Sequence, residues 1–151
     1  MSAASRHGLS LVDERRGFHS GLALFNAGEF FEAHDAWEEI WSQVQDRRRE
    51  RFYRGLIRAA VTLELLRRGR AVGVRQVFVS CLEEWEGLPD GFMGLDRPAF
   101  VARLRHAIEP AITDLETRHV QIDPGRLFAI ELLYDPFESP RNGEGTAGAS
   151  G

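Results

Sequence analysis

A histidine and a glutamate four residues apart are the side chains of this sequence best placed to do chemistry. His34 and Glu38 lie in the segment EFFEAHDAWEEIW. On a helix, side chains at positions i and i+4 share a face, so the imidazole and the carboxylate can meet or converge on one ligand. The pair could be a general base with its orienting carboxylate, or two internal partners that satisfy each other. We take His34 and Glu38 as candidate catalytic residues and keep the structural interpretation open.

The remaining histidines, acids and the cysteine do not favour a metal centre. A di-iron bundle needs a Glu-x-x-His motif on each of two helices, and this chain has that spacing once, at Glu116 and His119. The zinc-protease motif His-Glu-x-x-His is absent from the sequence. Cys81 is the one cysteine, and its apolar surroundings are typical of a small buried hydrophobe. We therefore predict no metal site, and the sequence indicates no cofactor.

The helix expected to carry the pair spans residues 29–45. On a helical wheel, its apolar residues fill one arc, which is typical of a helix with a buried face. His34 and Glu38 fall just outside that arc, between Trp41 and Phe31. The wheel thus places both polar groups at the margin of the core, flanked by aromatic rings.

The next expected helix, residues 48–68, is apolar over most of its circumference and could supply partners for the pair. Arg54 and Arg58 share a face at i and i+4, whereas Glu64 falls on the wheel close to Tyr53. A buried carboxylate needs a partner, because burying it unpaired costs several kcal/mol or raises its pKa. We expect these polar side chains to face the helix of His34.

Helical periodicity recurs along the chain, while strand-like alternation covers only short stretches. The expected helices are residues 11–27, 29–45, 48–68, 71–88 and 98–115, the last kinked at Pro110, with a short one after Pro124 that ends near Tyr134. LFNAGEFFEAHDAWEEIW and LLRRGRAVGVRQVFVSCLEEW both read as helix, glycine turn and helix. The pattern predicts an all-α, single-domain bundle of about five to six helices built from antiparallel helical hairpins.

Composition and charge narrow the domain organisation and the partners. A chain of 151 residues with 43% hydrophobic residues suits one core. We expect residues 1–10 to be a flexible N-terminus, 11–136 the helical domain and 137–151 a disordered tail. The net charge of −4 argues against nucleic acid as a partner. Without an apolar segment suited to a membrane span or a leader peptide, we expect no membrane association and a cytoplasmic location.

Three segments resemble a known family: FNAGEFFEAHDAWEEIW, then GLIRAAVTLELLRRGR, then GVRQVF. Over roughly residues 18–112 the chain is similar to the bacterial and archaeal domain of unknown function 309 (DUF309). The resemblance implies an all-helical bundle and leaves the biochemical activity unassigned. The family pattern falls on Gly28, Glu32, His34, Glu38, Trp41 and Gly55. Gly55 lies mid-helix, where we expect it to permit close approach of the helix that carries His34.

Two functions remain open from the sequence. The first is a protein that binds or processes a small, anionic ligand in a pocket around His34 and Glu38, with His34 as proton acceptor. The second is a tetratricopeptide-like interaction or homodimerisation module, in which the pair is structural and the partner is a protein. Whether the chain is an enzyme stays open. The candidate ligand-binding residues are Phe31, Glu32, Trp41, Tyr53, Arg54, Arg58 and Glu64.

Overall fold

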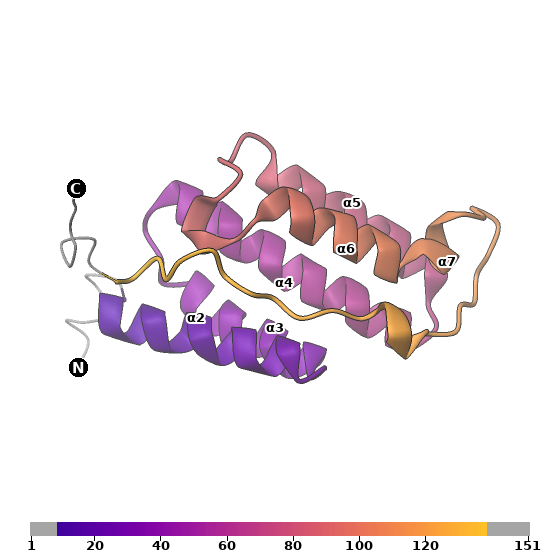
Figure 1. Ribbon diagram of the computed structural model, residues 1–151, viewed down its shortest axis with the longest axis horizontal. Helices are drawn as coiled ribbons and strands as arrows, with labels where there is room; N and C mark the ends of the chain where they lie inside the picture. The colour runs from indigo at the N-terminus through magenta and orange to yellow at the C-terminus, as the bar shows by residue number, and fades with distance from the viewer. Residues whose placement is uncertain (1–8, 139–151) are drawn as a thin grey trace.

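Helices make up nearly all the regular structure of the computed structural model, which describes residues 9–138 (Figure 1). In chain order they are α2 (Leu11–Asn26), α3 (Phe30–Trp41), α4 (Arg47–Arg67), α5 (Ala71–Trp85), α6 (Arg97–Ala107) and α7 (Glu109–Ile112), with 3-10 turns η1 (Phe92–Gly94) and η2 (Pro124–Arg126). Residues 9–138 contain no strand, only one isolated bridge. The predicted all-α, single-domain class is confirmed. Most of the expected flexible N-terminus and disordered tail lies outside the described residues.

Local signals place the starts of α2 to α5 and the ends of α2 and α4 within one residue of the predicted positions, whereas α3 and α5 end before the predicted residues 45 and 88. Ser10 of α2 and Asp46 of α4 are N-caps, since their side chains accept backbone hydrogen bonds of 3.1 and 2.9 Å from the first helical turn. Gly28 after α2 and Gly69 after α4 have φ angles of +80° and +78°, in the left-handed region that glycine enters at little cost. These glycines separate α2 from α3 and α4 from α5.

Two predictions for the C-terminal third need correction. The expected helix 98–115 forms two helices, α6 and α7, that meet at Ile108. Pro110 explains the break, because it has no N–H to donate and its ring crowds the carbonyl one turn earlier. The short helix expected between Pro124 and Tyr134 is wrong. Only η2 is helical there, and residues 127–137, called here the C-terminal strap, are non-helical.

The C-terminal strap avoids a helix because its backbone and apolar side chains are used by the rest of the bundle. In Figure 1 it runs lengthwise along the molecule, between α2 and α6. The Asn26 side chain accepts from the N–H of Ile130 at 2.7 Å and donates to its carbonyl at 3.0 Å. The ring of Phe128 packs on Phe25 and Phe100, with centroids 5.7 and 5.4 Å away. A helix here would withdraw these groups from α2 and α6.

A tryptophan set over a glycine fastens α2 to α3. Trp37 of α3 is fully buried, and its Nε1–H donates to the carbonyl of Phe18 at 3.2 Å. A Cβ on Gly21 of α2 would lie 2.1 Å from that indole nitrogen. Only glycine leaves room for this contact, so Gly21 is required by packing.

The same contact fastens α4 to α5. Trp85 donates to the carbonyl of Phe52 at 3.0 Å, and a Cβ on Gly55 would lie 1.8 Å from its indole nitrogen. Gly55 therefore makes room for Trp85 of α5. The prediction that Gly55 permits close approach of α3, the helix that carries His34, is wrong. The sequences FHSGL and FYRGL thus have matching structural roles in the two helix pairs.

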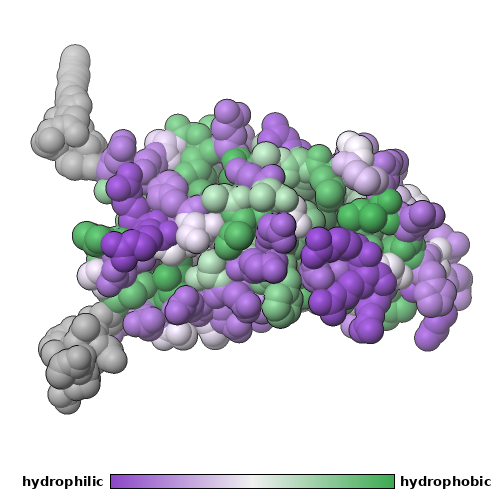
Figure 2. Space-filling view, turned by 90° about the horizontal axis from the view of Figure 1, so that it is seen from below, coloured by the Kyte–Doolittle hydropathy of each residue, from purple (hydrophilic) through white to green (hydrophobic). Residues whose placement is uncertain are grey.

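Helix α4 is the central element, because it packs against both α3 and α5. Its core side chains, such as Leu56 and Leu63, are almost completely buried. Figure 2 shows the opposite situation on the face seen from below, where hydrophilic residues interleave with scattered apolar ones. Among the described residues, no helix is long and apolar enough to span a bilayer.

Candidate functional site

The His34 and Glu38 side chains meet on the outer part of α3. His34 Nε2 lies 3.5 Å from Glu38 Oε1, and the two side chains are 20% and 52% exposed. On its other edge, His34 Nδ1 lies 3.3 Å from Asp35 Oδ1 and from the Phe31 carbonyl oxygen. The Phe31 ring packs beside the imidazole, with centroids 5.5 Å apart. The pair is accessible to solvent and is not sealed in the core.

Glu38 also lines a pocket of about 290 Å³ between α3, α4 and α5. Four of the predicted site residues meet there, together with three aliphatic side chains; the lining is Glu38, Trp41, Arg54, Arg58, Ile57, Val61 and Val77. His34 is not part of the lining, so a molecule in the pocket would contact Glu38 and not His34. This combination of apolar wall and a few charged groups is typical of small-ligand sites.

The two arginines of the pocket are held in place by one carboxylate of α5. Glu84 Oε2 lies 3.2 Å from Arg54 Nη2 and 3.5 Å from Arg58 Nη2. Arg58 Nη1 also donates to Ser80 Oγ at 2.7 Å. Two positive charges therefore share one negative partner, and their planar donor groups are already oriented.

Two nitrogen donors at this site are buried without an acceptor. Trp41 Nε1 and Arg58 Nε each expose almost no surface and have no hydrogen-bond partner among the described residues. Arg54 lies over the Trp41 ring, with its guanidinium carbon 5.8 Å from the ring centroid. Leaving such a donor unsatisfied costs about 1–3 kcal/mol. Because neither nitrogen is open to solvent, an acceptor reaches it only after the Trp41 or Arg58 side chain turns.

The structure places the other predicted site residues away from this pocket. Phe31 covers His34 and is 48% exposed. Glu32 is exposed in the first turn of α3. Glu64 lies near the end of α4 and pairs with Arg67 and Arg68, two residues of its own helix region. None of these three lines the pocket.

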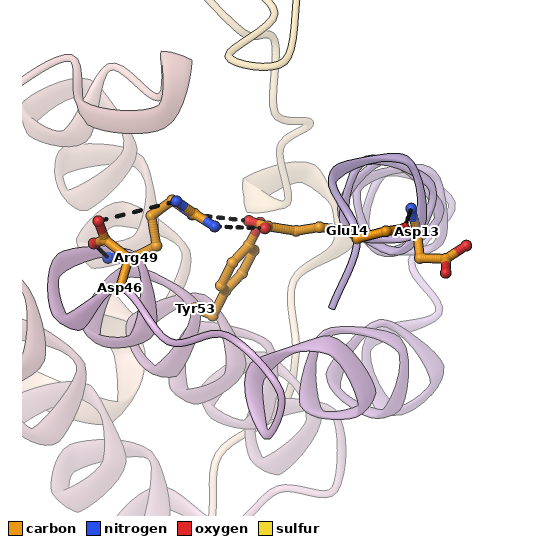
Figure 3. Close-up of polar contacts among 6 residues, drawn as sticks. Asp13, Glu14, Asp46, Arg49 and Tyr53 are labelled. Atoms are coloured by element: carbon orange, nitrogen blue, oxygen red, sulfur yellow. Dashed lines mark hydrogen bonds and ion pairs between the residues drawn. The ribbon is translucent and has the colours of Figure 1, made fainter. Parts of the chain in front are cut away.

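Tyr53 belongs to a second, sealed cluster with Glu14 of α2 and Arg49 of α4 (Figure 3). Glu14 is only 1% exposed. Its carboxylate accepts from Tyr53 Oη at 2.7 Å, from Arg49 Nη2 at 2.7 Å and from Arg49 Nε at 3.1 Å. Asp46 caps α4 beside it, with an oxygen 4.0 Å from Arg49 Nη1. Every polar group of the cluster has a partner.

Packing in the sealed cluster shifts the pKa values of Tyr53 and Arg49. Burial, followed by the charge and the hydrogen bond of Glu14, raises the pKa of Tyr53 well above its usual value. Burial acts to lower the pKa of Arg49, but the hydrogen bond and charge of Glu14 outweigh it and raise that pKa. Tyr53 therefore stays a neutral hydrogen-bond donor to Glu14.

Sequence reasoning missed Glu84, Ser80, Glu14 and Arg49. A signal for Glu84 was present, because two arginines at i and i+4 on a largely buried helix require a counter-ion. The acidic end of α5, in the segment CLEEW, is a source of one. No comparable signal pointed to Glu14, whose neighbours in sequence are all charged: DERR.

Two further groups bear on chemistry. One ligand atom each of His34, Asp35 and Glu38 lies within 4.8 Å of the others, so these are the described residues that could hold a cation. Two of the three are exposed acids, which commonly gather without an ion.

Cys81 is fully buried, and burial raises the pKa of its thiol to about 12. It is a core side chain, as predicted, and lacks the thiolate that a nucleophile needs.

The fold and the site define a small all-helical protein with a charged pocket at the junction of three helices. Residues 18–77 match the family described as "Domain of unknown function (DUF309)". The resemblance read from the sequence is therefore confirmed over that segment, which covers α3, α4 and most of α2. Pocket residues Glu38 to Val77 lie within it, whereas Ser80 and Glu84 follow it.

A protein of Aquifex aeolicus (strain VF5) described as "Uncharacterized protein" is 33% identical over 72 residues. That match covers 48% of this chain and 22% of the Aquifex protein. The chain thus spans about a fifth of that relative's length. The description of this relative names no activity.

Proposed function

We propose that this protein binds a small molecule that carries an acidic group and an apolar body, in the pocket between α3, α4 and α5. The observation that carries the proposal is the pair Arg54 and Arg58, which share one carboxylate beside two buried, unpartnered donors. An oxyanion from a ligand would supply the second negative charge to the partly exposed guanidinium groups, and an acceptor to Trp41 Nε1 once that side chain turns. Charge-assisted hydrogen bonds of this kind are about twice as strong as neutral ones.

Preorganisation supports the same proposal. Glu84 and Ser80 fix the guanidinium of Arg58 before any ligand arrives. Binding then orders fewer side chains, and less of the interaction energy is lost to conformational entropy. The aliphatic residues Ile57, Val61 and Val77 would cover the apolar part of the ligand. The pocket volume, about 290 Å³, suits a molecule smaller than a typical drug, since pockets for drug-sized ligands measure roughly 300–1,000 Å³.

Glu38 and His34 take different roles in this proposal from those expected from the sequence. Glu38 lines the pocket and would contact the ligand, whereas His34 contacts Glu38 from beside it. His34 is therefore a positioning residue for the Glu38 carboxylate. Any proton transfer to a bound molecule would pass first through Glu38.

Thermal unfolding with single-acid probes tests the proposal. We expect 4-methylpentanoate or benzoate to raise the Tm of the wild-type chain, and inorganic phosphate to do so less, because it has no apolar part. At a hundredfold excess over Kd the stabilisation is about 2.7 kcal/mol, which corresponds to roughly 5–10 °C. Arg58→Gln should abolish the shift. Arg47→Gln is the matched control, since Arg47 is exposed at the start of the same helix. An equal shift in both variants, or no shift with any probe, would overturn the proposal.

A further inference from the structure

The pocket carries charges of opposite sign on two of its walls, and the two arginines share a single carboxylate outside its lining. Arg54 and Arg58 come from α4, and Glu38 comes from α3. Within residues 9–138, the Glu38 carboxylate lies 3.5 Å from His34 Nε2 and within 4.0 Å of no arginine, while the pocket arginines pair with Glu84. The acidic and basic groups of one pocket are therefore more than 4.0 Å apart, too far to satisfy each other directly.

A ligand with only an acidic group would pair with the arginines of α4 and leave Glu38 of α3 without a ligand partner. Its oxyanion would contact Arg58 and Trp41 on one wall. On the other wall, the Glu38 carboxylate would repel a second negative group of the ligand and would make no favourable electrostatic contact with an apolar group. A ligand with an amine as well as an acid matches both walls. The ammonium group would take the place of water at the Glu38 carboxylate, which is 52% exposed and free to accept further hydrogen bonds.

Resting on the proposed function, we infer that the ligand is a small zwitterion with an aliphatic body, of the class of free aliphatic amino acids. Its carboxylate binds the partly exposed guanidinium groups of Arg54 and Arg58 beside Trp41, its ammonium group binds Glu38, and its side chain packs on Ile57, Val61 and Val77. The size of the pocket agrees with a body of a few carbon atoms. His34, 3.5 Å from the Glu38 carboxylate, holds that carboxylate beside the pocket.

Three probes of nearly equal shape separate the contributions of the two charges. Free leucine carries both groups, 4-methylpentanoate lacks the amine, and 3-methylbutylamine lacks the carboxylate. Isothermal titration of the full chain should give free leucine a Kd at least about tenfold lower than either analogue, the factor expected for one good charged contact. The amine alone should bind most weakly, because it uses neither Arg58 nor Trp41.

Glu38→Gln tests which wall recognises the amine. In this variant free leucine should fall to the affinity of 4-methylpentanoate, and 4-methylpentanoate itself should bind unchanged or more tightly, since a repelling charge is gone. Glu39→Gln is the matched control, because Glu39 is the exposed neighbour on α3 that does not line this pocket. The circular dichroism spectra of both variants should match that of the wild type, because the Glu38 side chain is 52% exposed and its contact with His34 Nε2, at 3.5 Å, lies outside the core.

The outcomes distinguish this inference from the proposed function. Equal affinities of free leucine and 4-methylpentanoate in the wild type, with both lost in Arg58→Gln, would overturn the zwitterion inference and leave the acid-binding pocket standing. A preference for free leucine that survives Glu38→Gln would also overturn it. If none of the three probes binds the wild type, both the inference and the proposed function are wrong.

Discussion

Two carboxylates, Glu14 of α2 and Glu84 of α5, each hold basic or phenolic groups of α4, but they do so in different surroundings. Glu14 is 1% exposed, and its oxygens accept three hydrogen bonds from Tyr53 and Arg49. The Glu84 side chain is 15% exposed and serves two arginines that are 38% and 35% exposed. The first cluster is closed and satisfied. The second opens onto a pocket beside two donors without acceptors.

The comparison shows why similar residue types can have unlike roles. A buried ion cluster with every group paired stabilises the fold only modestly but is costly to break. In a partly exposed cluster with more donors than acceptors, a substitution lowers the free energy of unfolding only a little, and a ligand that brings acceptors stabilises the cluster. Satisfaction of hydrogen bonds, more than the presence of charge, separates the structural cluster from the candidate site.

The largest expected difference between the clusters lies in stability. Glu14→Gln leaves the partly buried Arg49 with only Asp46, 4.0 Å from its Nη1, as counter-ion. It should lower the free energy of unfolding by about 2–3 kcal/mol, somewhat less than the roughly 3–5 kcal/mol for breaking a fully buried pair. Glu84→Gln should lower it by roughly 1 kcal/mol or less, because Arg54 and Arg58 can turn to water. Urea denaturation followed by circular dichroism measures both. Equal losses would remove the distinction between a sealed and an open cluster.

Alkaline pH should weaken the sealed cluster through Tyr53. Tyr53→Phe removes a hydrogen bond to Glu14 and should cost about 1 kcal/mol at pH 7. The pKa of Tyr53 is raised on folding, so its stabilising contribution is complete below the unfolded value near pH 10 and is lost as pH rises beyond it. The stability gap between wild type and variant should therefore shrink by about 1.4 kcal/mol per pH unit above pH 10 and then reverse. Both proteins keep Cys81, so the difference isolates Tyr53; a gap that stays constant to pH 11 would contradict the sealed geometry.

The smallest expected effect concerns the thiol one turn before Glu84. Cys81 is buried, and burial raises the pKa of its thiol to about 12, so the reactive thiolate is scarce at pH 8. A thiol-specific disulfide reagent should leave the folded chain unlabelled and react fully in urea. Labelling of the folded chain within minutes would show that solvent reaches behind the pocket into the core.

The sequence was sufficient for the helical class and for most helix positions, because caps, glycine turns and periodicity are local signals. Gly28 and Gly69 ended helices as expected. The C-terminal strap could not be predicted in this way. Its segment 127–132, apolar except for Glu131, has no local signal against a helix, and the competing partners, such as Asn26, are distant in sequence.

The candidate site was predictable where one helix face carried it, and less so across helices. His34, Glu38 and Trp41 share α3, while Arg54 and Arg58 share α4, so their spacing was informative. The wheel for α4 could not reveal that Tyr53 turns toward Glu14. It also gave no hint that Glu84 supplies the counter-ion, since both facts depend on how α2 and α5 pack on α4.

The indole N–H signals of the three tryptophans offer the most direct test of the central claim. Trp37 and Trp85 donate to backbone carbonyls, whereas Trp41 has no acceptor within residues 9–138. In a ¹⁵N-resolved titration with free leucine and 4-methylpentanoate, the Trp41 signal, assigned by its loss in Trp41→Phe, should shift saturably while the other two stay in place. A Trp41 signal that remains unmoved through the whole titration would contradict a ligand pocket between α3, α4 and α5.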